Sequence, residues 1–412
     1  MKKKKILIHS IVFSPDGVST AYLYNDIALG LTKKCYEVIV LTTIPHYNVV
    51  ESSLAKQPLV KKLLGLYYES DFNGIRVLHV PLKKYNNTII RLLSFIYWHI
   101  SSFFLGLSVN DIDYIISPSP PLSIGFVSIL IAKIKKAKFI YNVQEIYPDL
   151  LIKHGGLKSK ILISSLKWLE KFVYNNADAV VTIDQQFYNQ IVDRFLEPKK
   201  LKIVSNFVDN TLYKPITDVI VLPEPFENNK NKIKILYAGN IGFFQDWEPI
   251  LYAANILRET NIEFWIIGEG VKKDFLIEKI QKDQLFNIKI FPYQNRELIP
   301  FINSYADIHF ISINKEMEQE GFPSKVYTIM ASAKPLIVIT GKKTPLYNFL
   351  SELNCSILVT ENRNENFLKS IVELANDKCK QNELGQRGYK VICQNYTKEK
   401  VVEKYVQIFE SL

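Results

Sequence analysis

The chain has 412 residues, of which 48% are hydrophobic, 22% charged and 12% aromatic, and this composition is that of a globular protein with sizeable cores. The 16 glycines and 18 prolines are too few for a disordered or collagen-like chain. The formal charge of +10 is unevenly placed: residues 1–200 hold 25 basic and 15 acidic residues, whereas the rest of the chain holds 26 of each. This asymmetry favours an anionic surface or ligand for the N-terminal half, with plain solubility as the alternative.

The cysteines and the N-terminal residues indicate no metal site, disulfide framework or signal peptide. The four cysteines form no CxxC pair and have no histidine at ligand spacing, so the sequence predicts neither a zinc site nor a disulfide framework, and it fits a reducing compartment. The lysine run at residues 2–5 resembles the start of a signal peptide, but the apolar run after it stops at His9. We therefore expect no signal peptide.

In chain order, short β-branched runs alternate with helical stretches. The N-terminal strands are expected at 5–10, 37–43, 114–117, 138–144, 179–183 and 202–205, and the first helix at 20–31. A proline-rich and asparagine-rich connection at 214–232 precedes a second series of expected strands at 233–238, 263–268, 288–291, 308–311, 335–339 and 357–359. This alternation predicts two doubly wound parallel sheets.

Two apolar segments raise the question of a membrane. Residues 88–109 are long enough to span a bilayer, but Arg91, His99 and several serines interrupt the segment and sheet strands flank it. We expect a buried or half-buried helix there, with interfacial contact as the alternative. Residues 54–68, with Lys56, Lys61 and Lys62 among leucines, have the composition of a membrane-surface helix or of an ordinary amphipathic helix.

Loops that follow the first strand of each half are rich in small residues. One contains Gly17, and the other contains Gly239, Asn240 and Gly242. Such loops lie at the carboxyl edge of a parallel sheet and open onto a helix N-terminus, where backbone N–H groups can face an anion. A tight turn without a ligand has the same composition. The third glycine turn, at 267–270, is more typical of structure than of binding.

The most specific stretch runs from Glu318 to Pro335. An acidic residue, Glu320, precedes a Gly-Phe-Pro-Ser turn that opens a predicted helix, so the amide of Ser324 and the ammonium of Lys325 are candidates for holding a diphosphate, while Glu320 accepts sugar hydroxyls.

This stretch resembles the nucleotide-sugar motif of the retaining glycosyltransferases of family 4, which have GT-B architecture. In that family a glutamate is followed after seven residues by a second one; Glu320 matches the first, and Thr328 stands at the second. Further segments resemble, in order, the branch that builds O-antigen, capsule and colanic-acid repeats, in which fucosyl and N-acetylfucosaminyl transferases occur. They are residues 43–47, 117–121, 143–148, 206–209 and 237–242.

The resemblance implies an α/β protein of two Rossmann-like domains that face a cleft. Residues 1–205, joined by a C-terminal helix at 397–412, would bind the acceptor, and residues 206–396 would bind a UDP- or GDP-sugar. The implied catalytic residues are Glu320, Glu145 and Lys325, and the implied acceptor-side residues are His46, Gln144 and Glu145. Donor binding falls to Gly17, Gly239, Asn240, Gly242, Ser324, Lys325 and Thr328.

Two departures from the family pattern bear on the donor. Thr328 removes a charge-assisted bond to the donor ribose, worth on the order of 1.5 to 3 kcal/mol. The basic pair that often follows the glycine loop is replaced by Asn240 and Gln245, so Lys325 must carry more of the diphosphate charge. Glu145 has a structural alternative, in which it only ties the strand end to a neighbouring loop.

The resemblance further implies no cofactor and no metal, and the Asp111-Ile112-Asp113 sequence is interpreted as accidental because it precedes a strand. The expected acceptor is a polyprenyl-diphosphate-linked saccharide, and the expected location is the inner face of the cytoplasmic membrane, reached through the basic N-terminal half. Two alternatives remain: a GT-B sugar-nucleotide epimerase, and a non-catalytic membrane-associated subunit that kept the fold. Nucleic acid is not expected, because no recognition motif accompanies the basic charge.

Overall fold

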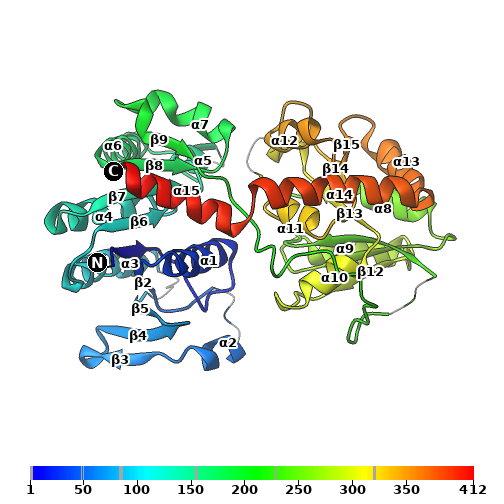
Figure 1. Ribbon diagram of the computed structural model, residues 1–412. Coiled ribbons are helices and arrows are strands. Elements are labelled where there is room, and N and C mark those ends of the chain that lie inside the picture. The colour runs from blue at the N-terminus through cyan, green and yellow to red at the C-terminus, as the bar shows by residue number, and fades with distance from the viewer. Residues whose placement is uncertain are drawn as a thin grey trace. The chain divides into compact units, whose positions relative to one another are not determined.

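The structure is a computed structural model that describes residues 3–47, 49, 51–82, 87–153, 156–227, 229, 231–318 and 322–412. The chain divides into two compact units (Figure 1). Unit 1 consists of Met1–Asn206 and Lys398–Leu412, and unit 2 consists of Phe207–Thr397.

Unit 1 is built on one sheet, which has nine strands within its described residues, in the order β3-β4-β5-β2-β1-β6-β7-β8-β9. All neighbouring pairs are parallel except β3 with β4 and β4 with β5. The strands are β1 Lys5–His9, β2 Glu37–Thr43, β3 Val60–Lys62, β4 Tyr67–Phe72, β5 Ile75–Val80, β6 Tyr114–Pro118, β7 Lys138–Val143, β8 Ala179–Thr182 and β9 Leu201–Ile203.

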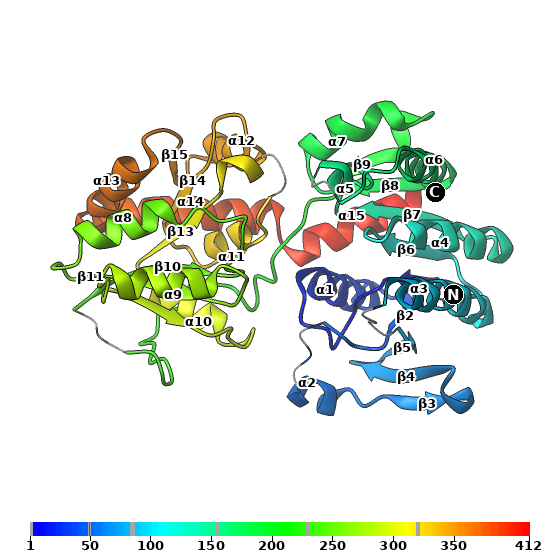
Figure 2. The ribbon, with the colours of Figure 1, turned by 180° about the vertical axis from the view of Figure 1, so that it is seen from behind.

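Helices cover both faces of the central parallel part of this sheet, which is why strands such as β1 and β6 consist of continuous apolar runs. Figure 2 shows α3, α4 and α6 side by side on one face, whereas α1 packs beside α15 on the other. The helices are α1 Ser19–Lys33, α2 Glu51–Lys56, α3 Thr88–Ser108, α4 Leu122–Lys135, α5 Asp149–Lys153, α6 Lys160–Asn176, α7 Gln185–Ile191 and α15 Lys398–Ser411, with 3-10 turns at Leu63–Gly65, Val192–Arg194 and Pro198–Lys200.

The last helix, α15, belongs to the core of unit 1. The side chain of Tyr405 is fully buried, and its hydroxyl accepts a hydrogen bond of 2.7 Å from the Asn142 side chain on β7. Tyr114 on β6 donates to the Phe409 carbonyl oxygen at 3.1 Å. A Cβ added to Gly30 on α1 would lie 2.4 Å from Val402, so the two helices pack closely there.

Unit 2 has six parallel strands in its described residues, in the order β12-β11-β10-β13-β14-β15. This is the strand order of a Rossmann fold. The strands are β10 Ile233–Ala238, β11 Ile262–Ile267, β12 Ile288–Phe291, β13 Ile308–Ser312, β14 Leu336–Ile339 and β15 Ile357–Val359. The helices are α8 Glu248–Ile256, α9 Lys273–Lys282, α10 Ile299–Tyr305, α11 Lys325–Ala331, α12 Pro345–Leu353, α13 Arg363–Asn376 and α14 Lys378–Asn395, with a 3-10 turn at Lys315–Met317.

The two parallel sheets confirm the predicted fold class, and every strand predicted in the two series is present. The prediction for residues 54–68 was wrong, because this segment contains the end of α2, the strand β3 and a 3-10 turn before β4. β3 and β4 pair as an antiparallel hairpin at the edge of the sheet, so Lys61 and Lys62 lie on a strand and not on a helix.

The expectation for residues 88–109 was a buried or half-buried helix, and the structure has a half-buried one. A helix is present as α3, but only Trp98, Ser102 and Gly106 are buried. By length and composition it is the one helix of the described chain that is apolar enough to cross a membrane, and 17% of its most apolar window is buried. The helix connects β5 to β6, which belong to the same sheet, so both of its ends are fixed in unit 1.

Candidate functional site

In unit 2 the strand order reverses between β10 and β13, and ligands of such sheets bind at this point, outside the carboxyl ends of the strands. The loop after β10 contains Gly239, and the segment after β13 leads to α11 and Lys325. The structure brings these two predicted residues together. Gly239 has φ +150°, and a Cβ added to it would lie 2.5 Å from the Lys325 ammonium.

Lys325 is partly buried beside this glycine. Its Nζ lies 3.8 Å from the centroid of the Tyr237 ring, in a cation–π contact. No carboxylate among the residues that the structure describes pairs with it. Burial of the ammonium lowers the pKa of Lys325 to about 7, because desolvation disfavours the charged form. An anion bound at this point would restore the missing charge partner.

The glycine loop itself is held by internal hydrogen bonds. The amide of Gly239 donates to the Ile267 carbonyl at 2.8 Å, and the amide of Gly242 donates to the Gln245 side chain at 3.0 Å. The carbonyl of Asn240 accepts from the Tyr237 hydroxyl at 2.6 Å, while the Asn240 side chain is exposed. The expectation that the Gly239 amide faces an anion was therefore wrong, and the contribution of this glycine is the space that it leaves for Lys325.

Around the start of α11, the predicted residues differ in whether their side chains are free to contact a ligand. Ser324 is exposed, and its side chain makes no capping hydrogen bond to the helix. The Thr328 hydroxyl donates to the Lys325 carbonyl at 2.9 Å, so it is satisfied within the helix and offers no charge to a ligand. Glu320 lies outside the described residues.

An ion network that was not predicted from the sequence joins the loops after β10 and β13. Arg363 of α13 pairs with Asp246 at 3.2 Å and also with Glu318, and it donates to the Ile313 carbonyl at 3.0 Å. These partners follow β10 and β13, so one guanidinium joins the two loops of the switch point. No sequence signal connects them, because Arg363 is separated from Asp246 by 117 positions.

Lys272 was also missed. Its amide donates to the Ile241 carbonyl at 2.9 Å, and its ammonium lies 4.8 Å from the Phe243 ring centroid and 5.1 Å from that of Phe275. Lys272 thus places a cation beside the glycine loop, where the sequence lacks a basic pair. Lys272 could not be predicted from the sequence around the glycine loop, because it follows β11 and the loop follows β10.

In unit 1, Gly17 and His46 lie together at the carboxyl edge of the sheet. The carboxylate of Asp16 accepts hydrogen bonds from the amides of His46 at 2.8 Å and Tyr47 at 2.7 Å, and the Gly17 amide donates to the Tyr47 carbonyl at 2.8 Å. The Gly17 amide therefore does not face an anion, contrary to expectation. The His46 ring contacts the Thr43 hydroxyl at 3.0 Å through Nδ1.

Gln144 and Glu145 follow β7 and are fixed through their backbone. The Ser119 hydroxyl accepts from the amides of Gln144 at 3.0 Å and Glu145 at 3.2 Å, and it donates to the Glu145 carbonyl at 3.0 Å. The Glu145 carboxylate is thus free of this tie. Desolvation raises its pKa, and the hydrogen bond with the Tyr147 side chain opposes that effect. A carboxylate with a raised pKa on an ordered loop is suited to hydrogen bonding with a polar ligand.

No cluster of three or more histidines, cysteines or carboxylates suited to a metal occurs in the described part of the chain. In the Asp111 to Asp113 sequence, the Asp113 carboxylate accepts from the Lys5 amide at 2.7 Å and thereby fixes the start of β1.

Comparison with known proteins follows the same division of the chain. Residues 20–206 match the family described as glycosyl transferase 4-like domain, and residues 220–391 match glycosyl transferases group 1. The chain is 25% identical over 352 residues to the putative colanic acid biosynthesis glycosyl transferase WcaI of Escherichia coli K12, covering 83% of this chain and 84% of that protein. It is 25% identical over 274 residues to the probable glycosyltransferase WbjE of Pseudomonas aeruginosa, covering 65% and 67%.

Among solved structures, the Anabaena protein HepE in complex with UDP-glucose superposes with a TM-score of 0.69 at 14% identity, covering 99% of this chain and 100% of that one. This likeness concerns the fold.

Proposed function

Because the chain is a glycosyltransferase with the GT-B fold, we propose that it moves a sugar from a UDP- or GDP-sugar to a lipid-linked saccharide, with retention of anomeric configuration. The process would be the synthesis of a bacterial surface polysaccharide. This proposal is supported by the WcaI relative, whose name refers to colanic acid, and by the UDP-glucose in the HepE complex.

The observation that carries the proposal is the position of Lys325. A lysine whose ammonium lies over the Tyr237 ring, beside a glycine of the switch-point loop, is a site for one anionic group. The diphosphate of the donor supplies that group, and the charge that builds on it during transfer strengthens the interaction in the transition state. Lys272 adds a second cation beside the same loop.

The chemistry requires no side-chain base. In a retaining transfer, the bond between the anomeric carbon and the diphosphate breaks while the acceptor oxygen forms a bond on the same face. The leaving diphosphate oxygen takes the acceptor proton, so the catalytic work of the protein is to position both substrates and stabilise the diphosphate. Glu320 would hold sugar hydroxyls, and Glu145, Gln144 and His46 would lie on the acceptor side.

The charge of the chain supports the proposed acceptor and location. A polyprenyl-diphosphate-linked saccharide lies at the inner face of the cytoplasmic membrane, and the excess of ten positive charges falls in residues 1–200. Lys133, Lys136 and Lys138 are exposed in unit 1. The enzyme would therefore work at the membrane surface, without a cofactor or metal of its own.

Donor binding is tested by titration calorimetry with UDP and GDP on the native protein and on Lys325→Met. We expect the variant to bind at least thirtyfold more weakly, since a lost charge-assisted bond costs about 2 kcal/mol. The matched control is Lys334→Met. Lys334 also has a pKa lowered by burial, but it precedes β14 and so lies at the opposite edge of the sheet. Equal affinity in Lys325→Met would contradict the donor site.

Two outcomes would point to the alternatives. Conversion of a nucleotide sugar in the absence of acceptor would indicate an epimerase. Absence of nucleotide binding in the folded native protein would indicate a non-catalytic subunit, an alternative that the satisfied hydroxyl of Thr328 keeps open.

A further inference from the structure

An apolar surface lies open on one face of unit 1. On α3, eight large hydrophobic side chains are exposed, and those of Ile89 and Phe104 are 69% and 64% accessible. The eight are Ile89, Ile90, Leu92, Leu93, Ile96, Tyr97, Ile100 and Phe104. Five of them recur at intervals of three or four residues, from Ile89 to Phe104, and so form one stripe along the helix. A stripe of this length on a soluble unit marks a surface that contacts something else.

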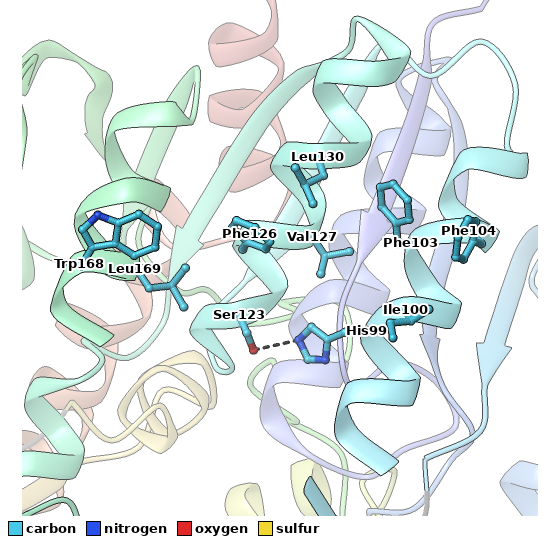
Figure 3. Close-up of a pocket in the computed structure, with 10 residues that line it drawn as sticks. All are labelled: His99, Ile100, Phe103, Phe104, Ser123, Phe126, Val127, Leu130, Trp168 and Leu169. Carbon is cyan, nitrogen blue, oxygen red and sulfur yellow. Dashed lines mark hydrogen bonds between the residues drawn. The ribbon is translucent and has the colours of Figure 1, made fainter. Parts of the chain in front are cut away.

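The surface continues from α3 onto its two neighbours. A groove of about 510 Å³ lies between α3, α4 and α6, and Figure 3 shows its lining, which is aliphatic and aromatic except for the pair His99 and Ser123 at one end. These two are hydrogen-bonded at 2.9 Å. On the α6 side Trp168 is 64% exposed. We call the exposed stripe of α3 together with this groove the α3–α4–α6 face.

The charges on the three helices of this face are nearly all positive. The three helices carry six basic residues and a single carboxylate, Glu170, which is 3% exposed and pairs with Arg194 at 2.6 Å. The basic residues are Arg91, Lys133, Lys135, Lys160, Lys167 and Lys171. Among the described residues, no carboxylate pairs with Lys160, Lys167 or Lys171. The three helices therefore present exposed apolar and cationic side chains to their surroundings, and their one carboxylate is buried.

We propose that the α3–α4–α6 face docks on an anionic lipid bilayer, with the α3 stripe and Trp168 entering the interface and the lysines contacting headgroups. Apolar side chains on a helix that lies in the interface plane, together with lysine and tryptophan, form the composition that binds such membranes. The α3–α4–α6 face would be the part of the enzyme that contacts the membrane, as the proposed function requires. The evidence for this contact is the exposure and charge of the three helices, independent of the transfer chemistry.

A second copy of the chain is a poorer occupant. Two copies that meet through the same face, as a twofold dimer requires, would bring six cations against six cations in an apolar contact. Insertion of α3 across the bilayer is excluded by its attachment. Its ends lead into β5 and β6, and a Cβ on Gly106 would lie 2.6 Å from Ile131 of α4, so the helix is tightly packed on one side.

The four tryptophans allow a direct test on the native protein. Trp98, Trp247 and Trp265 are 0%, 6% and 0% exposed, so Trp168 is the one that a membrane can reach. With vesicles of phosphatidylcholine and phosphatidylglycerol we expect a blue shift of the emission, and quenching when the acyl chains are brominated. Both effects should be absent in Trp168→Phe and should weaken with salt.

Two charge variants of equal size locate the contact. Changing Lys160, Lys167 and Lys171 to Gln should lower partitioning onto anionic vesicles about a hundredfold, since each basic residue at such a surface contributes roughly fivefold. The matched control changes Lys56, Lys61 and Lys62, near the β3–β4 edge, to Gln and should leave partitioning within twofold. Phe104→Gln, at an exposed position, should reduce quenching without changing the thermal unfolding temperature.

Binding that leaves Trp168 unquenched, or an equal loss in both lysine variants, would overturn the proposal. So would a dimer in sedimentation that Phe104→Gln dissociates and that does not bind vesicles. UDP titrations of the same proteins keep this test separate from the donor site: Lys325→Met should bind vesicles normally, and the lysine variants of α6 should bind UDP normally.

Discussion

The same crossover connection is built differently in the two units. In unit 1 the chain passes from β5 to β6 through α3, which has 21 residues and buries three of them. In unit 2 the equivalent passage from β12 to β13 runs through α10, which has 7 residues and buries four. One side of α3 packs on the core of unit 1, whereas its exposed hydrophobic side chains pack on no core.

The loops at the carboxyl edges of the two sheets also differ, because a cation lies at the edge in unit 2 and a carboxylate in unit 1. In unit 2 the ammonium of Lys325 lies over the Tyr237 ring beside the glycine loop, and no carboxylate among the described residues pairs with it. In unit 1 the loops after β1 and β2 are closed by the Asp16 carboxylate, which holds two backbone amides. Unit 2 thus has a partly buried cation beside its glycine loop, whereas unit 1 combines ordered loops with an exposed apolar and cationic surface. The following predictions test this division.

The largest effect is expected at Gly268, where a Cβ would lie 1.9 Å from the Gly239 carbonyl oxygen at φ +149°. Gly268→Ala should destabilise unit 2 by about 3 kcal/mol or more and abolish UDP binding, since backbone must shift. Urea unfolding and calorimetry measure both. Gly74→Ala is the control, because φ is +84° there but no atom lies within 4 Å, and it should cost about 1 kcal/mol and leave UDP binding intact.

The next effect concerns pH. The pKa of Lys325 is about 7, so below that value its ammonium is charged, and above it the lysine must take up a proton when a diphosphate binds. UDP affinity should therefore fall by up to about tenfold per pH unit between pH 7 and 9, with proton uptake visible as a buffer-dependent enthalpy. Lys325→Arg should remove this slope, because guanidinium stays charged. A slope that persists in Lys325→Arg would assign the titration to another group.

Glu145→Gln tests whether a loop of unit 1 contacts the acceptor. If the Glu145 carboxylate contacts the acceptor, the variant should turn over about tenfold more slowly at saturating donor, while UDP affinity stays the same. Its backbone ties to Ser119 do not involve the carboxylate, so the loop should remain in place. Unchanged turnover would leave Glu145 with the structural role alone.

The smallest effect is expected for Thr328→Glu. A carboxylate at this position of α11 could reach the donor ribose, and nucleoside diphosphate binding should tighten severalfold. Weaker binding in a variant that unfolds at the same temperature would show that the pocket of unit 2 has been rebuilt around threonine.

Much of the fold could be predicted from local pattern. Each parallel strand that begins with a run such as Ile6 to Ile8 is buried on both faces, and a fully apolar run identifies it without tertiary information. The hairpin of β3 and β4 was missed, because exposed edge strands such as Val60–Lys62 lack that apolar signal, and the lysines and leucines around them resemble an amphipathic helix.

The candidate site was predicted less completely than the fold. Gly239 was identified because it lies in the glycine loop after the first strand of the second series. Lys325 was identified because it follows the Gly-Phe-Pro-Ser turn, which opens a predicted helix and resembles the family motif. Lys272 and Arg363 could not be identified, because they reach the same loops from other strands and helices, and a single sequence contains no record of those contacts.

By itself, the sequence determined the class of fold, the two series of strands and the unequal distribution of charge, because these depend on local composition and periodicity. Only the tertiary structure decided that the amides of Gly17 and Gly239 are occupied by neighbouring carbonyls and that α3 is exposed. The physical reason is that the hydrogen bonding of an amide and the burial of a side chain depend on which other segments pack against them. The sequence of α3 is equally apolar whether a neighbouring helix covers its stripe or leaves it open, and here α4 covers only one side.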